Sequence, residues 1–239
     1  MPIHAAAQRP LKVGGITPFT ATDFPGKLST VIFVQGCPWR CGYCHNPHLQ
    51  PRTADSPVAW EGVLALLRRR VGLVDAVVFS GGEPTMDPGL EAAIREVREL
   101  GFCIGLHSGG THPTRLRKVL PLLDWIGLDI KIDFDSYENV TRVRNSGTSA
   151  LESLRAVLDS GVAHECRTTA HPTLHTEAGL EALARQLASM RVTHYALQVF
   201  RPTGCNDNAL NQSMRAGFPS QTLVETLTDL FSQFTLRTS

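Results

Sequence analysis

The sequence predicts an α/β fold in which a parallel sheet is covered by helices. Short apolar runs rich in β-branched and aromatic residues alternate with longer segments whose apolar residues recur at helical spacing. Strand–helix units in tandem are typical of a parallel sheet. The 239 residues suffice for one sizeable core. The alternation alone leaves two architectures open, an open doubly wound sheet and a partial barrel.

Six strands and six helices are expected from residue 30 onward. The strand candidates cover 30–35, 74–80, 102–108, 124–131, 164–170 and 194–200. The helix candidates cover 58–70, 87–99, 113–121, 149–160, 177–190 and 220–234. The fifth helix shows the spacing clearly, with Leu180, Leu183 and Leu187 on one face. Gly101 and Gly161 are placed to end the second and fourth helices.

The two ends of the chain are expected to add loops and one helix. Residues 1–13 are predicted to be a loose lead-in, and the turn-rich segment 15–27 a hairpin or loop before the first strand. The last helix is most simply a covering helix. We therefore divide the chain into an N-terminal lead-in and loop (1–29), a main body (30–204), and a C-terminal loop with its covering helix (205–239).

The composition excludes several classes of protein. Lys and Arg number 23 against 22 Asp and Glu, so no basic field attracts nucleic acid. No apolar run approaches the roughly 20 residues that a membrane span needs. The first ten residues lack the apolar core of a signal peptide. Clustered thiols without such a signal favour a reducing compartment, so we expect a cytoplasmic protein with no membrane or nucleic-acid partner.

Three of the six cysteines lie within eight residues, as Cys37-x3-Cys41-x2-Cys44, directly after the first strand. Three neighbouring thiols cannot all pair in disulfides, but they can share a metal. A four-iron cluster normally takes four thiolates, so three would leave one iron open for catalysis. The alternatives are zinc held by the three thiols and His45, whose position next to Cys44 is poor for closing a tetrahedron, and redox or incidental cysteines.

The motif over residues 36–47, with Tyr43 before the last cysteine, resembles the signature of the radical SAM superfamily. More narrowly it is similar to the glycyl-radical-enzyme activases, in particular to anaerobic ribonucleoside-triphosphate reductase activating proteins and pyruvate formate-lyase activating enzymes. The resemblance runs from about residue 14 to about residue 204. It implies that the main body is a (β/α)6 partial TIM barrel with a lateral opening. It also implies a [4Fe–4S] cluster on Cys37, Cys41 and Cys44, and S-adenosylmethionine (SAM) as cosubstrate.

A second motif, Gly81-Gly82-Glu83-Pro84, follows the second strand. Paired glycines let a ligand approach the backbone closely, although they also suit an ordinary strand–helix turn. In the family, the similar Gly-Gly-Glu-Pro motif holds the SAM amino group through backbone carbonyls and the Glu. The resemblance also places the backbone around Tyr43 against adenine.

Two further strand ends carry polar residues. His107-Ser108 ends the third strand, and the resemblance puts Ser108 near the SAM carboxylate. Activases of the pyruvate formate-lyase type have Asp where this chain has His107, a departure that bears on the monovalent-cation site expected there. A hydrogen-bonded histidine at the barrel mouth is the alternative. On the fourth strand Asp129 and Lys131 share an inward face, where ions need partners; the family's Asp-x-Lys pair contacts SAM, and a structural ion pair is the alternative.

The last two strands add two arginines. Arg167 shares a face with Glu165 on the fifth strand, so it either contacts the SAM ribose or carboxylate, as the resemblance implies, or pairs with Glu165. Arg201 aligns roughly with an activase histidine that contacts SAM. Cys166 points outward and is expected to be a small core residue. Asp23, before the first strand, is placed by the resemblance near the substrate or the active-site mouth.

The function implied is reductive cleavage of SAM at the cluster and abstraction of a glycine Cα hydrogen from a partner glycyl radical enzyme, with anaerobic ribonucleotide reductase as the expected partner. Reduced flavodoxin or ferredoxin would supply the electron. The first alternative is a radical SAM enzyme acting on a small molecule, similar to 7-carboxy-7-deazaguanine synthase. The second is a non-catalytic metal-binding adaptor, which predicts zinc or no metal.

Overall fold

A computed structural model describes residues 9–238, which form an eight-stranded sheet in which strands β1 to β8 lie side by side in chain order. Strand β1 pairs antiparallel with β2, and every later pair is parallel. The strands are β1 (Val13–Thr20), β2 (Ser29–Val34), β3 (Ala76–Gly81), β4 (Cys103–Ser108), β5 (Trp125–Asp129), β6 (Ala163–Ala170), β7 (His194–Val199) and β8 (Gln233–Arg237).

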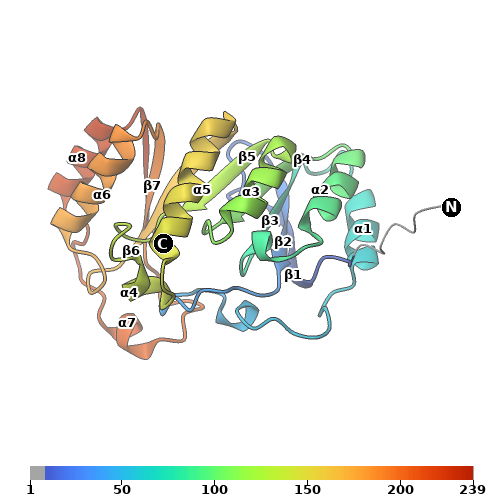
Figure 1. Cartoon of the computed structure of the whole chain (residues 1–239), viewed down its shortest axis with the longest axis horizontal. Coiled ribbons are helices and arrows are strands. Elements are labelled where there is room, and N and C mark those ends of the chain that lie inside the picture. The colour runs from blue at the N-terminus through green and yellow to red at the C-terminus, as the bar shows by residue number, and fades with distance from the viewer. Residues whose placement is uncertain (1–8, 239) are drawn as a thin grey trace.

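Helices connect the strands and cover one face of the sheet, from α1 beside β2 and β3 to α8 at the far end (Figure 1). They are α1 (Trp60–Arg68), α2 (Leu90–Glu99), α3 (Pro113–Val119), α4 (Tyr137–Thr141), α5 (Ser146–Ser160), α6 (Glu177–Ser189), α7 (Asn208–Gln212) and α8 (Gln221–Leu230). Three 3-10 turns are η1 (Pro47–Leu49), η2 (Pro84–Met86) and η3 (Leu120–Leu122). Among the described residues, no helix is long and apolar enough to cross a membrane.

The six predicted strands are confirmed as β2 to β7, each within a few residues of its expected bounds. The sheet order also decides between the two architectures that the alternation left open. A doubly wound sheet reverses its strand order at a switch point, whereas this sheet runs from β1 to β8 without a reversal. The α/β partial barrel is therefore the observed fold.

The sheet has one strand more at each edge than the six expected, β1 before β2 and β8 after β7. The segment 15–27 contributes to β1 and forms a hairpin with β2, one of the two forms expected there. The predicted helix 220–234 is wrong at its end, because α8 stops at Leu230 and the next residues form β8. Phe231 takes an extended backbone, and Phe234 stacks near Tyr195 of β7. Residues 1–8 of the predicted lead-in lie outside the described part.

The hydrophobic core has two parts, one on each face of the sheet. The larger part lies between the sheet and its helices and includes Leu106, Leu128 and Cys166, which confirms Cys166 as a core residue. A smaller apolar cluster fills the barrel interior, where Phe24 packs on Trp125 at 5.5 Å between ring centroids. Each such buried side chain contributes about 1.5–3 kcal/mol. Polar side chains then occupy the carboxyl ends of the strands.

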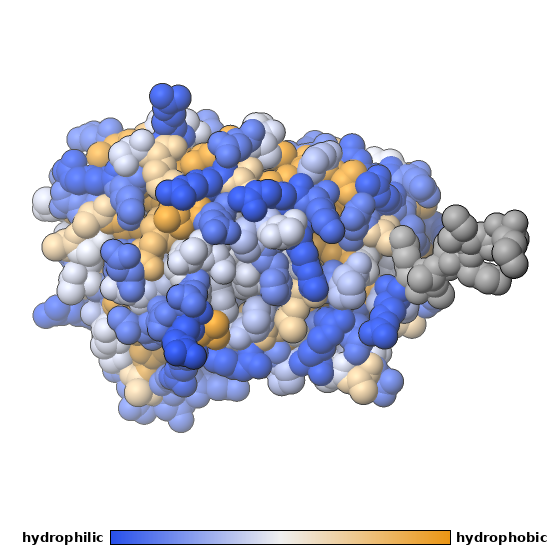
Figure 2. Space-filling model, in the orientation of Figure 1, coloured by the Kyte–Doolittle hydropathy of each residue, from blue (hydrophilic) through white to orange (hydrophobic). Residues whose placement is uncertain are grey.

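Hydrophilic residues cover most of the face seen in Figure 2, with small apolar areas between them. Single apolar side chains at a protein surface are ordinary. The features that can carry chemistry therefore lie inside the barrel mouth.

Candidate active site

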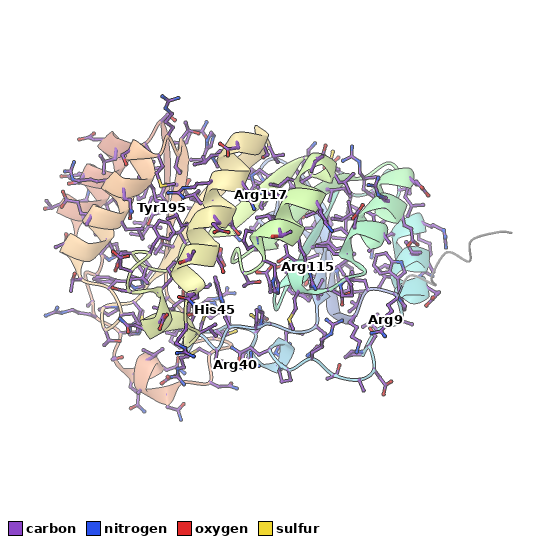
Figure 3. The ribbon with its side chains drawn as sticks, in the orientation of Figure 1. Arg9, Arg40, His45, Arg115, Arg117 and Tyr195 are labelled. Atoms are coloured by element: carbon purple, nitrogen blue, oxygen red, sulfur yellow. The ribbon has the colours of Figure 1, made fainter. Side chains whose placement is uncertain are left out.

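The cysteine loop leaves β2 and crosses the carboxyl ends of the strands. Its backbone is fixed on both sides: Gly36 N–H donates to Leu49 O at 2.8 Å, Cys37 N–H to Gln50 O at 3.0 Å, and Arg40 N–H to Thr141 O at 2.9 Å. Arg40 and His45, on this loop, lie in the lower middle part of the molecule in the view of Figure 3. The loop is thus held by the fold independently of any bound group.

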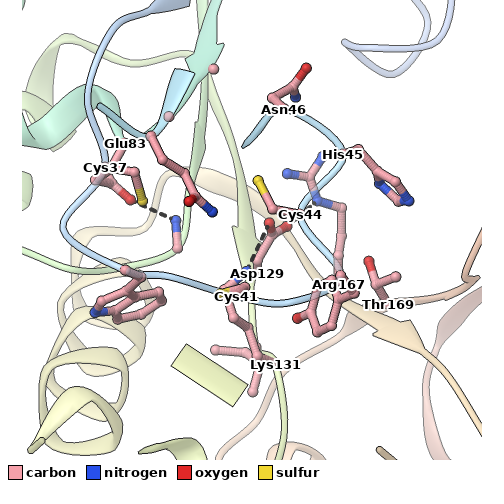
Figure 4. A pocket seen from close by; sticks show the side chains of 17 residues that line it. Cys37, Cys41, Cys44, His45, Asn46, Glu83, Asp129, Lys131, Arg167 and Thr169 are labelled. Atoms are coloured by element: carbon pink, nitrogen blue, oxygen red, sulfur yellow. Dashed lines mark hydrogen bonds and ion pairs between the residues drawn. The ribbon is translucent and has the colours of Figure 1, made fainter. Parts of the chain in front are cut away.

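The three thiols line one cavity, together with residues from β3, β5 and β6 (Figure 4). The lining includes ten of the site residues predicted from the sequence, namely Cys37, Cys41, Tyr43, Cys44, Gly81, Gly82, Glu83, Asp129, Lys131 and Arg167. Strands far apart in the sequence therefore bring these side chains to one place, as expected for the carboxyl end of a parallel barrel.

Burial favours the protonated form of two of these thiols, Cys37 and Cys41. Burial and the nearby Glu83 raise the pKa of Cys37 to about 12, and burial raises the pKa of Cys41. A bound cation reverses this preference, because metal coordination deprotonates a thiol. The donor set therefore fits a metal centre that supplies its own positive charge.

His45 does not face the thiols as a fourth ligand. Its Nε2 lies 3.0 Å from the carbonyl of Arg201, and its ring stacks on Phe200 at 5.5 Å. Within residues 9–238, no three His, Cys, Asp or Glu side chains are grouped to hold a single metal ion. The Cys3His arrangement weighed for zinc is not formed by this side chain.

The glycine pair meets the cysteine loop directly. A Cβ on Gly82 would lie 2.3 Å from the carbonyl oxygen of Gly36, and Gly81 has φ +113°. Both glycines line the cavity, but their steric requirement comes from the protein's own backbone. The paired glycines thus let the end of β3 pack against the loop that carries Cys37.

Glu83 is held in place by four donors. Its Oε1 accepts from Thr85 N–H, from the Thr85 hydroxyl at 2.6 Å and from the Ser108 hydroxyl at 2.9 Å, and its Oε2 accepts from Gly109 N–H at 2.9 Å. Burial raises the pKa of Glu83, and these hydrogen bonds oppose the rise. Oε2 accepts one of these four hydrogen bonds, and Glu83 lines the cavity. Ser108 itself does not line the cavity and instead positions this carboxylate.

Asp129 lies between two cations. Its Oδ1 accepts from Arg167 Nε at 3.0 Å, and its Oδ2 lies 3.8 Å from Lys131 Nζ. Burial raises the pKa of Asp129, but Arg167 and Lys131 outweigh burial and hold it below its usual range. Gly127 makes room for the arginine, since a Cβ there would lie 2.6 Å from Arg167 Cζ. The proposed Glu165–Arg167 pair is therefore wrong: Arg167 pairs with Asp129.

Lys131 also contacts the cysteine loop. Its Nζ lies 5.6 Å from the Tyr43 ring centroid and 5.8 Å from that of Trp39, within cation–π range. Burial lowers its pKa, but Tyr43, Cys41 and Asp129 together raise it well above the ordinary value. The Tyr43 side chain is buried, packs with Val140 and Phe200, and also lines the cavity. Lys131 therefore stays charged beside the thiols.

A second cleft adjoins the first and shares His45, Arg167 and Thr169 with it. Arg201 lies here, exposed, and the structure does not bring it into the cysteine cavity. Asp23, from the hairpin, lines the same cleft. Glu165 faces it as well, joined to Arg237 of β8 by two hydrogen bonds of 2.8 Å.

His107 is a hydrogen-bonded histidine at the barrel mouth, which is the alternative weighed for it from the sequence. Its Nε2 donates to the carbonyl of Asp23 at 2.9 Å, and its Nδ1 lies 3.3 Å from the Ser80 hydroxyl. Burial, then Arg167, lowers the pKa of His107 to about 3. The His107 imidazole is therefore neutral at neutral pH.

Several lining residues were not predicted. These are Trp39, Asn46, Gln50, Gly109, Ile130 and Thr169. Trp39 and Asn46 stand inside the cysteine motif, so their proximity to it was a usable signal. Thr169 follows Arg167 by two residues on β6 and so shares its inward face, which the two-residue period of a strand could have indicated. Gln50 comes close only because η1 folds the chain back, which no local pattern indicates.

Comparison with known proteins agrees with this geometry. The Radical SAM superfamily profile matches residues 31–191. A protein of Methanocaldococcus jannaschii whose name assigns it to the glycyl-radical enzyme activating enzymes is 32% identical over 208 residues, covering 82% of each chain. The pyruvate formate-lyase-activating enzyme of Clostridium pasteurianum is 30% identical, covering 75% of this chain and 77% of that one.

Solved structures share the fold at low identity. Streptococcus suis SuiB bound to S-adenosylmethionine superposes with a TM-score of 0.66 at 13% identity, over 85% of this chain and 48% of that one. This chain thus spans about half the length of SuiB. QueE from Escherichia coli gives a TM-score of 0.56 at 18% identity, over 96% of this chain and 94% of that one. At such identities the likeness shows the fold alone.

The barrel, the three-thiol loop and the profile match together define a class: the chain belongs to the radical SAM superfamily. Within it, the relatives that match over most of their length place the chain among the glycyl-radical enzyme activating enzymes. The cofactors of the superfamily are a [4Fe–4S] cluster and SAM. The cavity fits both by its donor set, with three thiols on one loop and fixed charges of both signs opposite them.

Proposed function

We propose that this chain is an activase that uses a [4Fe–4S] cluster and SAM to generate a glycyl radical in a partner enzyme. The observation that carries the proposal is the convergence of Cys37, Cys41 and Cys44 on one cavity with Glu83 and Asp129. The relatives named as activating enzymes support it, because they match across most of both chains. The partner we propose is an anaerobic ribonucleotide reductase.

The chain's residues would divide the work of binding. Cys37, Cys41 and Cys44 would hold the cluster as thiolates. When bound, the cluster supplies one electron that cleaves SAM into methionine and a 5′-deoxyadenosyl radical, which takes a hydrogen atom from a glycine Cα to give 5′-deoxyadenosine and the glycyl radical. Glu83, through Oε2, would accept from the SAM ammonium group, beside the Gly81–Gly82 backbone.

The charged group around Asp129 would bind the rest of SAM. Arg167 and Lys131 neutralise Asp129 and leave the three side chains with one net positive charge, which suits a carboxylate. The backbone near Tyr43 would meet the adenine. Ser108 would act through Glu83, and Arg201 would contact the substrate in the second cleft rather than SAM. This revises the roles expected for the last two residues.

The second cleft would admit the partner's glycine loop. It opens beside the cysteine cavity and shares three lining residues with it, so a substrate placed there lies next to the reacting group. The β1–β2 hairpin and the end of β8 line its two sides. A one-electron donor such as reduced flavodoxin or ferredoxin would serve the cluster, and thiol clusters of this kind favour the reducing cytoplasm.

The experiment is radical transfer to a candidate partner. The reconstituted, reduced chain is mixed anaerobically with SAM and an anaerobic ribonucleotide reductase from the same genome, and the EPR spectrum is recorded. We expect a glycyl radical signal that requires both SAM and intact Cys41. SAM cleavage without any glycyl radical, in this reductase and in every other glycyl radical enzyme of that genome, would overturn the activase assignment and favour a small-molecule substrate.

A further inference from the structure

The segment after β7, residues 200–212, lies against the outer side of the cysteine loop. It contains α7, whose first turn is capped by Asp207. Neither the proposed cluster ligands nor the proposed SAM contacts come from α7. Residues that precede α7 in this segment nevertheless contact the cysteine loop at Gly42 and His45.

Three contacts join the two segments on either side of Cys44. The Cys205 thiol donates to the carbonyl of Gly42 at 3.5 Å. His45 Nε2 donates to the carbonyl of Arg201 at 3.0 Å. Gly204 packs so closely that a Cβ on it would lie 2.6 Å from the carbonyl oxygen of His45.

The segment is itself anchored to the barrel, so its contacts can hold the loop. His171, fully buried at the end of β6, lies with Nε2 3.0 Å from the carbonyl of Leu210. Within the segment, Asn211 Nδ2 donates to the carbonyl of Cys205 at 3.0 Å, which ties α7 to the residues before it. Phe200 packs between the rings of His45 and His171 at 5.5 and 4.9 Å. Movement of this segment would therefore be transmitted to the loop.

We propose that residues 200–212 are a clasp that fixes the backbone around Cys44 and so sets where the third thiolate stands. Gly204 and Cys205 are its positioning residues. The inference deepens the proposed function, on which it rests for the identity of the group that the loop holds. It adds that the loop geometry depends on a segment more than 150 positions away in the chain, as in the pair His45 and Arg201.

The test uses two glycines that share a backbone conformation but differ in their contacts. Gly204 has φ +87° and touches His45, whereas Gly217 has φ +75° with nothing within 4 Å of a built Cβ. Gly204→Ala and Gly217→Ala carry the same kind of backbone strain. Only the first displaces the cysteine loop.

The readout is the rate at which Cys44 is alkylated by limiting iodoacetamide in the reduced, cluster-free protein, measured by mass spectrometry with Cys103 as internal reference. We expect Gly204→Ala to raise the Cys44 rate at least fivefold and Gly217→Ala to change it less than twofold. After reconstitution, Gly204→Ala should also retain less iron and sulfide per chain. Equal Cys44 rates in the two folded variants would overturn the clasp.

A second pair of variants decides the matter if Gly204→Ala does not fold. Cys205→Val removes the thiol donor to Gly42 and keeps the shape, whereas Cys205→Ser keeps a donor. We expect faster alkylation of Cys44 in the Val variant, with the Ser variant near wild type. Identical rates in both would contradict the proposal. Since these rates are measured without cluster, SAM or partner, they are independent of whether the activase assignment holds.

Discussion

At the scale of single residues, burial favours one charge state of the side chains in the barrel mouth, and hydrogen bonds orient them in it. His107 shows this most clearly. A carbonyl can only accept, so Nε2 carries the proton toward Asp23, and Nδ1 is left to accept from the Ser80 hydroxyl. The neutral ring is therefore satisfied at both nitrogens, and protonation would break one of these bonds.

This arrangement predicts a loss of stability in acid. The pKa of His107 is about 3 in the fold and about 6.5 in the unfolded chain, so the unfolded state binds more protons between these values. Stability from this group is present above pH 6.5 and falls by up to about 1.4 kcal/mol per pH unit below it. We expect the free energy of unfolding, measured with urea between pH 4.5 and 7.5, to depend less steeply on pH in His107→Gln than in the wild type. The same slope in both proteins would contradict this account.

Ser108 offers a second prediction, because two roles for it can be separated. If it acts through Glu83, Ser108→Ala weakens SAM binding about 3- to 10-fold, which corresponds to about 1 kcal/mol for one lost hydrogen bond. The same change should then have no further effect in a Glu83→Gln background. Anaerobic calorimetry of SAM binding to the four reconstituted proteins tests this. Additive losses would instead indicate direct contact between Ser108 and SAM.

At the scale of elements, glycines decide where the cysteine loop and β3 meet. The loop can approach the strand end only because Gly82 has no side chain, whereas Gly62 in α1 is exposed with nothing within 4 Å of a built Cβ. The same substitution should therefore act in opposite directions at the two positions.

We expect Gly62→Ala to stabilise the protein by about 0.5–1 kcal/mol, because alanine loses less entropy in a helix. Gly82→Ala should destabilise it by more than about 1 kcal/mol and reduce cluster incorporation, since its Cβ would force Gly36 away from β3. Urea midpoints and iron content measure both effects. A Gly82→Ala protein with wild-type stability and iron content would show that the close approach is not required.

The elements that the sequence predicted well are those whose signal is local. Strands β2 to β7 carry apolar runs, and the helices between them carry 3.6-residue periodicity. The helix predicted at the end of the chain was too long because Phe231 and Phe234 have helical spacing. In the structure both rings lie near Tyr195 of β7, a contact that no local pattern indicates. Likewise, Arg167 and Glu165 share a strand face, but Arg167 pairs with Asp129 on the adjacent β5 and Glu165 pairs with Arg237 on β8, two strands away, which only the arrangement of the sheet reveals.

At the scale of the whole molecule, the two flanking strands frame the open side of the barrel. Both β1 and β8 lie at sheet edges, and residues beside or within each line the second cleft. The Glu165–Arg237 pair ties β8 to the barrel interior, with the Glu165 side chain 12% and the Arg237 side chain 36% exposed. The burial of this ion pair is therefore intermediate between that of a surface salt bridge and that of a fully buried one.

Removing one member should therefore cost an intermediate amount. We expect Arg237→Gln to destabilise the protein by about 1–2 kcal/mol, because it leaves the Glu165 carboxylate without its cation. Glu165→Gln added to Arg237→Gln should recover part of this loss. Thermal or urea unfolding of the wild type and of these two variants measures the change in stability. A double variant less stable than Arg237→Gln alone would show that the pair is not what holds β8.

The most direct test of the central claim is EPR of the anaerobically reconstituted, dithionite-reduced protein with and without SAM, together with an assay for 5′-deoxyadenosine. We expect a [4Fe–4S] signal that changes when SAM is added and the formation of 5′-deoxyadenosine, and we expect Cys41→Ala to abolish both. Cys103→Ala, which changes a thiol outside the loop, should behave as wild type. Stoichiometric zinc with no cluster signal, and no SAM cleavage, would contradict this claim.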